Sequence, residues 1–545
     1  MKIEISKTAL VAGFFSAAVP AFGQSGSEGS SFLLIGLISV AVLVLLAVLL
    51  QVSDNLLAIE ARQTGADRSG ANFSLFPRLA EIFRPAKPAF LSEETVYRLR
   101  RGHDINLAGK PESTTIQEMK VGTFALQPPN FIGMMPIPKI LVEEGQSVKA
   151  GDPIMFDKSR PEIQHVAPVS GEVIAINRGA KRSIAEVVIL ADKEQQYRKL
   201  PAFDYEKKSR EELVKYLLEN GGWTLFRQRP YNVLADLEEA PANIFISTFD
   251  TAPLAPDLNL VVEGRGEAFQ AGLNVLGKLT SGSVHLGLDA RGETVPSEIF
   301  TQAENVQKHW FSGKHPAGNV GVQIHHIAPI GDGTKVWTLG VQEVITLGAM
   351  FTEGRYNAER VIAVTGNEIS EPKYVRTMLG ASIADLTKDN LRSDHVRYIS
   401  GDVLSGEQKA GKGYLNFYDD QLTVIKEGDY FELFGWLIPG KFRPTVSRSY
   451  PNYLFKSMEY EADTNTHGEK RAFVVTGEYE AMLPMDVYPQ HLLKAILIND
   501  FERMEGLGIY EVVEEDLALC EFACTSKQPL QQILREGLDL MRAQG

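Results

Sequence analysis

Cysteine is nearly absent from this sequence: its 545 residues include two, Cys520 and Cys524. This scarcity excludes a scaffold built on disulfides and any intrachain site with four cysteine ligands. A basic excess is missing too, because 55 Lys and Arg residues stand against 69 Asp and Glu residues. A net charge of -14 lacks the basic footprint of nucleic-acid binding, so we expect no nucleic-acid partner.

Common catalytic motifs are also missing. Neither H-E-x-x-H nor G-x-S-x-G occurs. The segment GEQKAGKG (406–413) nearly matches a phosphate-binding P-loop, but Gly413 replaces the required hydroxyl residue and the β-rich YLNFY follows it. We read this segment as a mobile surface loop. His325 and His326 stand in VGVQIHHIAPI, a predicted strand, where adjacent residues face opposite sides and cannot share one metal. We therefore predict no catalytic, cofactor-binding or metal-binding residues.

The two cysteines leave one metal hypothesis open. In LALCEFACTSK they stand four positions apart, so on a helix they would share a face. Two thiolates could supply half of a zinc or iron–sulfur site, but no third cysteine exists and no histidine follows His491. Two partly buried thiols in a helix are the favoured interpretation.

The N-terminus carries two apolar segments. Residues 1–24 are typical of a secretory signal peptide, whose cleavage we leave open. The uncharged run FLLIGLISVAVLVLLAVLL (32–50) covers about 29 Å as a helix, roughly one bilayer core. We predict a transmembrane helix within 25–52, with lipid around residues 32–52, and a juxtamembrane linker over 53–95. Basic residues follow the run and none directly precede it, which predicts a cytoplasmic body.

Residues 139–196 form a predicted all-β unit. The halves VEEGQSVKAGD (142–152) and APVSGEV (167–173) resemble the two halves of a biotinyl/lipoyl barrel-sandwich. Lys158 lies near the place of a cofactor-carrying lysine. Its spacing to the second half is longer than in that pattern, and Arg160–Pro161 interrupts the expected tight hairpin. We favour a scaffold domain without an attached cofactor.

Strands alternating with helices predict a Rossmann-like α/β domain over 197–357, with its start at 96–138. LNLVVEG (258–264), read as a strand, leads into GRGEAFQAGLNVLGKL, which invites a dinucleotide-binding interpretation. However, Phe269 stands where the third glycine of G-x-G-x-x-G is needed for close helix packing. Plain α/β architecture is favoured.

The remaining chain completes an α/β multidomain fold. Over 358–430 the order strand, turn, strand and helix start at Ser382 resembles the β-grasp module called SLBB. Residues 431–545 predict a mixed and helical C-terminal domain. Its last helix, PLQQILREGLDLMRA, has one apolar face, formed by Leu530, Ile533, Leu534, Leu538 and Met541.

Eight stretches, taken in order, resemble one family. They are INRGAKR (176–182), FDTAPLAPD (249–257), SGKHPAG (312–318), VWTLGVQEVITLGAMFTEG (336–354), KYVRTMLGAS (373–382), ISGDVLSG (399–406), ELFGWLIPGKF (432–442) and EEDLALCEFAC (514–524). The chain from about Tyr97 to its end is similar to the A subunit of the Na⁺-translocating NADH:quinone reductase.

This resemblance implies membership of a six-subunit complex of the bacterial inner membrane, which moves electrons from NADH to quinone and exports Na⁺ to the periplasm. The complex uses FAD, FMN, riboflavin and iron–sulfur centres, whereas its A subunit is a peripheral cytoplasmic component that binds no cofactor. Its partners would be the B to F subunits, chiefly the membrane-embedded B subunit, with quinone near the A–B interface. A fold similar to the FMN-binding subunit of respiratory complex I is also implied.

One departure and two alternatives stay open. Family members start near the position of Leu99, so the apolar N-terminal stretch is additional, and an anchor is the simplest account. The alternatives are an Rnf-like electron-transport scaffold or adaptor, and a stand-alone nucleotide-dependent oxidoreductase. The identity of the quinone, the residues that contact it and the Na⁺ stoichiometry do not follow from the sequence.

Overall fold

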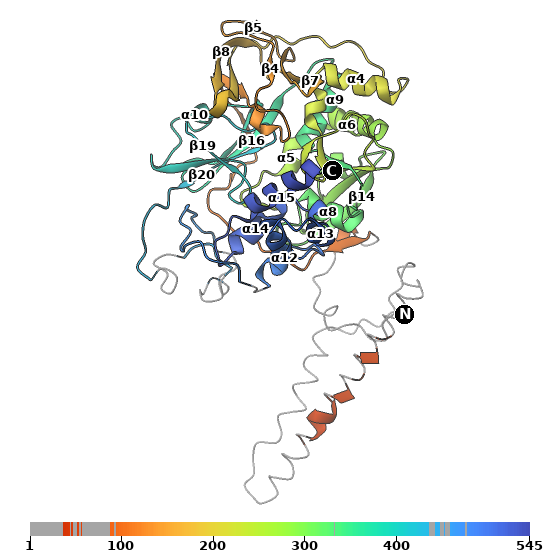
Figure 1. The fold of residues 1–545 in the computed structure, drawn as a ribbon, viewed down its shortest axis with the longest axis vertical. Helices are drawn as coiled ribbons and strands as arrows, with labels where there is room; N and C mark the ends of the chain where they lie inside the picture. The colour runs from red at the N-terminus through yellow and green to blue at the C-terminus, as the bar shows by residue number, and fades with distance from the viewer. Residues whose placement is uncertain are drawn as a thin grey trace, which may run out of the picture. The chain divides into compact units, whose positions relative to one another are not determined.

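A computed structural model describes most of the chain beyond Lys87. The described residues are 88–544 without 92–93, 332, 435–441, 447–451, 453–457 and 475–476, together with single positions between 36 and 56. The chain divides into two units, Met1–Lys87 and Pro88–Gly545, and Figure 1 shows the second as the labelled body.

The predicted signal peptide (1–24) lies outside the described residues, and the predicted membrane helix (25–52) and linker (53–95) lie largely outside them. The positions described between 36 and 56 are helical and exposed. Among the described residues, no helix combines the length and the apolar character needed to cross a bilayer. The membrane helix therefore stays a prediction.

The centre of the body is a seven-stranded sheet in the order β1-β14-β13-β12-β15-β10-β11. The first five strands are parallel, β10 is antiparallel to β15, and β11 is antiparallel to β10. The strands are β1 (Val96–Arg98), β10 (Arg227–Arg229), β11 (Val233–Leu234), β12 (Asn243–Ser247), β13 (Val284–Asp289), β14 (Gln307–Ser312) and β15 (Val336–Thr338). The predicted Rossmann-like layering is thus present.

Helices cover both faces of this sheet, because alternate strand residues point to opposite sides. On β12, Ile244 and Ile246 belong to the main core with α6 and α9, whereas Phe245 packs on the α8 side. The helices of this domain are α4 (Arg210–Glu219), α5 (Leu258–Val262), α6 (Gly266–Leu279), α7 (Glu298–Thr301), α8 (Val320–Ile327) and α9 (Val341–Thr352).

Helices α6 and α9 approach each other closely through glycine. A Cβ atom at Gly348 would lie 1.7 Å from the carbonyl oxygen of Ala268, and one at Gly272 would lie 2.2 Å from that of Val344. Only glycine permits such a backbone approach. The glycine that brings α6 close to its neighbour is therefore Gly272, three positions after Phe269.

Two small antiparallel sheets, β3-β9-β8-β5 and β4-β6-β7, form the β-unit. Their strands are β3 (Thr123–Leu126), β4 (Lys139–Ile140), β5 (Ser147–Val148), β6 (Pro153–Asp157), β7 (Arg160–Val166), β8 (Gly171–Arg178) and β9 (Ile184–Ala191). The expectation that Arg160–Pro161 would interrupt a tight hairpin was wrong. Asp157 pairs directly with Arg160, and Lys158 lies in the two-residue turn between them.

The segment 96–138, expected as the start of the α/β domain, supplies strands to three sheets. While β1 joins the seven-stranded sheet, β2 (Ile116–Glu118) joins a six-stranded sheet and β3 joins the β-unit. A pattern of short strands does not identify their partners, because pairing is decided by long-range contacts.

The six-stranded sheet has the order β19-β18-β20-β16-β17-β2. The predicted order of strand, turn, strand and helix start is confirmed, and the Ser382 hydroxyl accepts a hydrogen bond from the Asp385 amide as the helix cap. The elements are β16 (Glu359–Thr365), β17 (Lys373–Met378), α10 (Ile383–Leu386), β18 (Val396–Ser400), β19 (Glu407–Lys409) and β20 (Gln421–Lys426).

The C-terminal domain is a helical cluster with its own core. Its helices are α11 (Glu478–Met482), α12 (Pro489–Leu497), α13 (Phe501–Gly506), α14 (Glu514–Ala523) and α15 (Leu530–Gln544). The predicted apolar face of α15 is confirmed, since all five of its residues are buried. Both cysteines lie in the same core.

A buried arginine stands at each of two junctions between these parts. Arg360 of β16 pairs with Glu343 of α9, which joins the six-stranded sheet to the α/β domain. Arg229 of β10 pairs with Glu515 and Asp516 of α14, which joins the C-terminal helices to the same domain. The α/β domain is thus the part on which the others are held.

Candidate functional site

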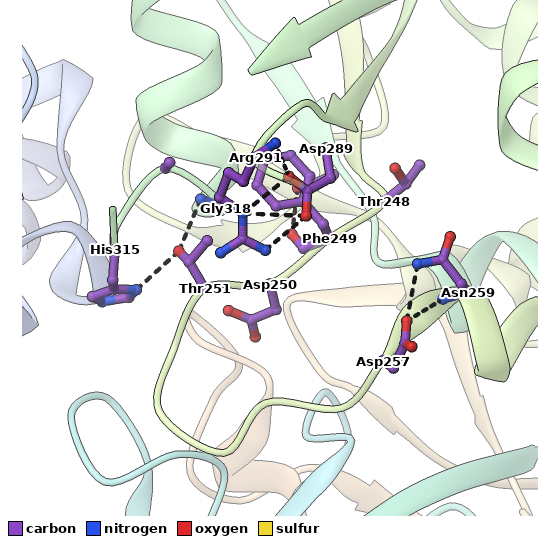
Figure 2. A network of polar contacts seen from close by, with 12 residues as sticks. Thr248, Phe249, Asp250, Thr251, Asp257, Asn259, Asp289, Arg291, His315 and Gly318 are labelled. Atoms are coloured by element: carbon purple, nitrogen blue, oxygen red, sulfur yellow. Dashed lines mark hydrogen bonds and ion pairs between the residues drawn. The ribbon is translucent and has the colours of Figure 1, made fainter. Parts of the chain in front are cut away.

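The candidate site lies at the carboxyl ends of β12, β13 and β14, where open α/β sheets bind their ligands. The loop FDTAPLAPD (249–257) follows β12, and the loop of SGKHPAG (312–318) follows β14. Figure 2 shows side chains from both loops meeting at this edge. Two of the stretches that carry the family resemblance are therefore neighbours in space.

Thr251 connects the two loops. Its hydroxyl accepts a hydrogen bond from the Gly318 amide at 3.0 Å and lies 3.1 Å from Nδ1 of His315. The His315 amide in turn donates to Oδ1 of Asp104 at 2.9 Å. The imidazole is buried, and this burial lowers the pKa of His315. A neutral ring held in this way is suited to fixing loops in place.

Arg291 is a cationic group at this edge, and it is paired with a carboxylate. Its Nε and Nη2 atoms donate to the two carboxylate oxygens of Asp289, at distances of 2.7 to 3.2 Å. Its guanidinium also lies 5.2 Å from the centre of the Phe249 ring. The carboxylate of Asp289 offsets the charge of Arg291, which weakens the attraction of this arginine for a phosphate group.

Asp250 has the most unusual carboxylate of the loop. Asp250 is exposed at the protein surface, but the protein atoms packed around its carboxylate disfavour the ionised form, and the charges of Asp402 and Glu515 act in the same direction. Together these effects raise the pKa of Asp250 to about 6. The loop therefore carries a carboxyl group with a raised pKa.

The far half of the loop is covered by other parts of the body. Gln421 of β20 donates to the Pro253 carbonyl at 3.2 Å, and the Asp257 amide donates to the Tyr374 hydroxyl at 3.1 Å. Leu254 is buried in a small cluster that includes Leu519 of α14. The place where a ligand would enter an open sheet is thus occupied by packed protein.

The glycine segment at 264–272 is not a dinucleotide cradle. Residues 258–262 form helix α5 and not the expected strand, with the Asp257 carboxylate accepting from the Asn259 amide as a cap. Five residues, four of them apolar, are too few to separate a strand period from a helix period, which explains the error. Phe269 is fully buried, with its ring 5.4 Å from that of Phe300.

The P-loop-like segment 406–413 contains strand β19, which pairs with β18, so the expectation of a mobile loop was wrong for its first half. The β-rich expectation for YLNFY was also wrong, because Tyr414 forms an isolated bridge to Ser382 and turns follow it. In a P-loop the glycine-rich segment leads into a helix. Here the segment contains a paired strand, and turns follow it, so it does not have the structure of a P-loop.

The two histidines expected on a strand lie on helix α8. Nδ1 of His325 is 2.7 Å from Oε2 of Glu511, and its Nε2 accepts from the Asp486 amide at 2.9 Å. His326 places Nε2 2.8 Å from the Pro484 carbonyl oxygen. Both rings tie α8 to the C-terminal domain.

Cys520 and Cys524 are fully buried beside Tyr479. The Cys520 thiol donates to the Tyr479 carbonyl, and the Tyr479 hydroxyl lies 2.9 Å from Sγ of Cys524. Burial raises the pKa of Cys520, which disfavours the thiolate that metals require. Within the described residues, no group of three or more His, Cys, Asp or Glu side chains is arranged to hold a metal.

Comparison with known proteins gives a consistent result along the body. Three family models match: the NqrA N-terminal barrel-sandwich hybrid domain at residues 97–192, the NqrA second alpha/beta domain at 208–356 and the NQRA C-terminal domain at 361–410.

Complete relatives align over most of the chain. The A subunit of the Na(+)-translocating NADH-quinone reductase from Yersinia pestis bv. Antiqua (strain Angola) is 38% identical over 451 residues, which is 82% of this chain and all of the relative. The corresponding A subunits of Neisseria meningitidis serogroup B and Alcanivorax borkumensis are 36% and 37% identical, with the same shares covered.

Proposed function

Because the chain belongs to the family of A subunits of the Na⁺-translocating NADH-quinone reductase, we propose that it is the non-redox peripheral subunit of such a complex. In this role it supports quinone reduction by NADH coupled to Na⁺ export from the cytoplasm to the periplasm. The observation that carries the proposal is the 38% identity over 451 residues, which covers the relative completely.

The geometry of the carboxyl edge supports a role without a bound flavin. Arg291 is paired with Asp289, and Leu254 is buried beside Leu519 of α14, so these side chains are engaged in contacts within the body. The cysteines likewise do not fit an iron–sulfur cluster, which requires four ligands. The flavins and iron–sulfur centres of the complex would then belong to its other subunits.

The edge acts instead as a junction. The loop 249–257 contacts the six-stranded sheet through Gln421 and Tyr374 and the C-terminal helices through Leu519. Such a rigid body suits a protein that positions partners. We expect these to be the B to F subunits, chiefly the membrane-embedded B subunit, with quinone reacting near the A–B interface.

Residues 32–52 would anchor the body to the bacterial inner membrane. Their side chains are almost entirely aliphatic, and Ser39 is the sole hydroxyl, so ion conduction or quinone chemistry within this segment is disfavoured. The basic residues after the run would keep the body on the cytoplasmic side. A single chain would thus gain membrane proximity without a new protein contact.

The first test is purification of the chain from its host membrane. We expect the other reductase subunits to co-purify, and we expect the chain expressed alone to show no visible absorption from flavin or iron–sulfur centres. Stoichiometric flavin or iron in the isolated chain would contradict the non-redox role. Absence of all other subunits would contradict membership of the complex.

The second test removes residues 1–52. The core of the body lies beyond this segment, so the truncated protein should fold and restore NADH:quinone activity to a complex that lacks the full-length chain. Its retention on membranes should be weaker. Full binding without restored activity would give residues 1–52 a direct role and contradict the anchor.

A further inference from the structure

A large groove lies between the six-stranded sheet and the C-terminal helices. It encloses about 1840 Å³. One side is formed by the end of β20 and by Val403–Leu404, and another by residues of α11 and α14. In Figure 1, α14 is one of the labelled helices of the C-terminal domain. The described parts of the stretch from Tyr430 to His467 complete the wall.

The size of the groove points to a polypeptide. Sites for small molecules enclose about 300–1,000 Å³, so this groove is roughly twice the upper limit. Its open lining combines Met458, Met482 and Phe522 with polar side chains. Mixed apolar and polar lining of this extent is typical of surfaces that bind a chain segment.

The groove is acidic. Three cationic side chains line it, Lys426, Arg443 and Lys527, against seven carboxylates: Glu368, Glu432, Glu459, Glu461, Asp463, Glu478 and Glu521. Arg443 is already paired with Glu432 at 3.0 Å. Glu459 and Glu461 form no hydrogen bond or ion pair with any residue the structure describes. This charge favours a ligand with basic side chains.

The same two glutamates lie on an extended segment with one free edge. On the paired edge, the Tyr460 amide donates to the Asn106 carbonyl and the Ala108 amide donates to the Tyr460 carbonyl, both at 2.9 Å. The backbone groups of Glu459 and Glu461 have no such partners within the described part of the chain. An extended peptide can add to an edge of this kind as a further strand.

An apolar rim borders the groove. Tyr430 and Glu432 line it, and the residues that alternate with them, Phe431 and Leu433, are 104% and 86% exposed. The segment is held at its base, because the Tyr430 hydroxyl donates to Asp463 at 2.6 Å. Held, exposed aromatic and aliphatic side chains mark a surface that another molecule covers.

We propose that this groove binds an extended, apolar and basic juxtamembrane segment of a membrane-embedded partner protein. The inference rests on the proposed function, which supplies the membrane partner. Cytoplasmic segments next to membrane helices are rich in Lys and Arg, which complements the carboxylates, and their apolar residues match the rim. Direct binding to anionic lipid is disfavoured because the groove carries the same charge as the headgroups.

Photo-crosslinking in the intact complex tests the occupant. Benzoylphenylalanine replaces Thr466, which lines the groove, or Phe431 on its rim, and the same probe at the exposed Leu497 of α12 serves as the control. We expect crosslinks from the first two positions to a basic juxtamembrane segment of a membrane protein of the complex, identified by mass spectrometry. Crosslinks to lipid, to a water-soluble protein or to nothing would overturn the proposal.

Charge reversal provides an independent measurement. The double variant Glu459→Lys/Glu461→Lys should weaken retention of the membrane-embedded subunits during purification at least tenfold. The matched control, Glu293→Lys/Glu502→Lys, reverses two exposed carboxylates outside the groove and should retain them normally. Equal retention by both double variants would overturn the proposal. Co-purification of the unaltered chain with the other subunits tests the proposed function separately, so the two failures are distinguishable.

Discussion

The two buried arginines hold their junctions in different ways. Arg360 and Glu343 are 1% and 5% exposed, and Arg360 Nη1 also donates to the Gln342 carbonyl and the Thr346 hydroxyl. Arg229 is equally buried, but its partner Glu515 is 31% exposed, so one of its two carboxylates still reaches water. The stability of a fully buried ion pair depends on both partners, because removing one leaves the other charge buried. We call the Arg360 pair closed in this sense. In the open cluster around Arg229, the exposed carboxylate can be hydrated again when the arginine is removed.

The contacts of Asp516 explain why the cluster around Arg229 keeps a fixed geometry although Glu515 is partly exposed. Its carboxylate accepts from Arg229 and from the Val513 amide at the start of α14. It also lies against α8, where a Cβ atom at Gly321 would come within 2.5 Å of it. One carboxylate thus fixes a strand, the start of one helix and the approach of another.

Arg360→Met should have the largest effect. It leaves Glu343 buried without its cationic partner, which costs about 3–5 kcal/mol of folding free energy. Urea unfolding followed by tryptophan fluorescence measures the loss, because Trp223 and Trp337 are buried in the adjoining α/β domain. Arg360→Met/Glu343→Leu should recover most of the stability. If the single variant is as stable as the parent, the closed cluster does not hold this junction.

Arg229→Met should cost less, near the lower end of about 3–5 kcal/mol, because one of the two carboxylates it leaves, Glu515, can turn toward water. The same urea experiment measures it, with Arg503→Met on the exposed face of α13 as the control. A loss equal to or larger than that of Arg360→Met would reverse the comparison.

The pH dependence should separate the two clusters further, with a smaller effect. Burial, with Glu343 nearby, raises the pKa of Asp420 beside Arg360 to about 7, and burial raises the pKa of Asp516 to about 6. A carboxyl whose pKa is raised in the folded state stabilises the fold at low pH, and this contribution is lost as pH rises through the raised value.

Asp420→Asn should therefore gain stability relative to the parent between about pH 6.5 and 7.5, whereas Asp516→Asn should change little in that interval. The quantity to measure is the difference in unfolding free energy between each variant and the parent at each pH. Burial lowers the pKa of His165 and His285 to about 4, so these groups destabilise the fold as pH falls below about 6.5. Parallel profiles for both variants would mean that the clusters titrate alike.

Long periodic segments and caps were predictable from the sequence. The apolar stripe of α15 and the cap at Ser382 follow from local pattern, and the structure has both. Short apolar segments were not predictable. Residues 258–262 and the histidines of α8 looked like strands, because a few β-branched residues suit either period.

The sequence by itself determined the multidomain α/β class, the apolar face of α15 and the likeness to one family. Composition and local spacing are sufficient for these. The tertiary structure alone decided that FDTAPLAPD and SGKHPAG share one edge through Thr251 and His315, and that Arg229 and Arg360 are buried at junctions. Those contacts join residues from 17 to 287 positions apart, and such pairings depend on how whole layers pack.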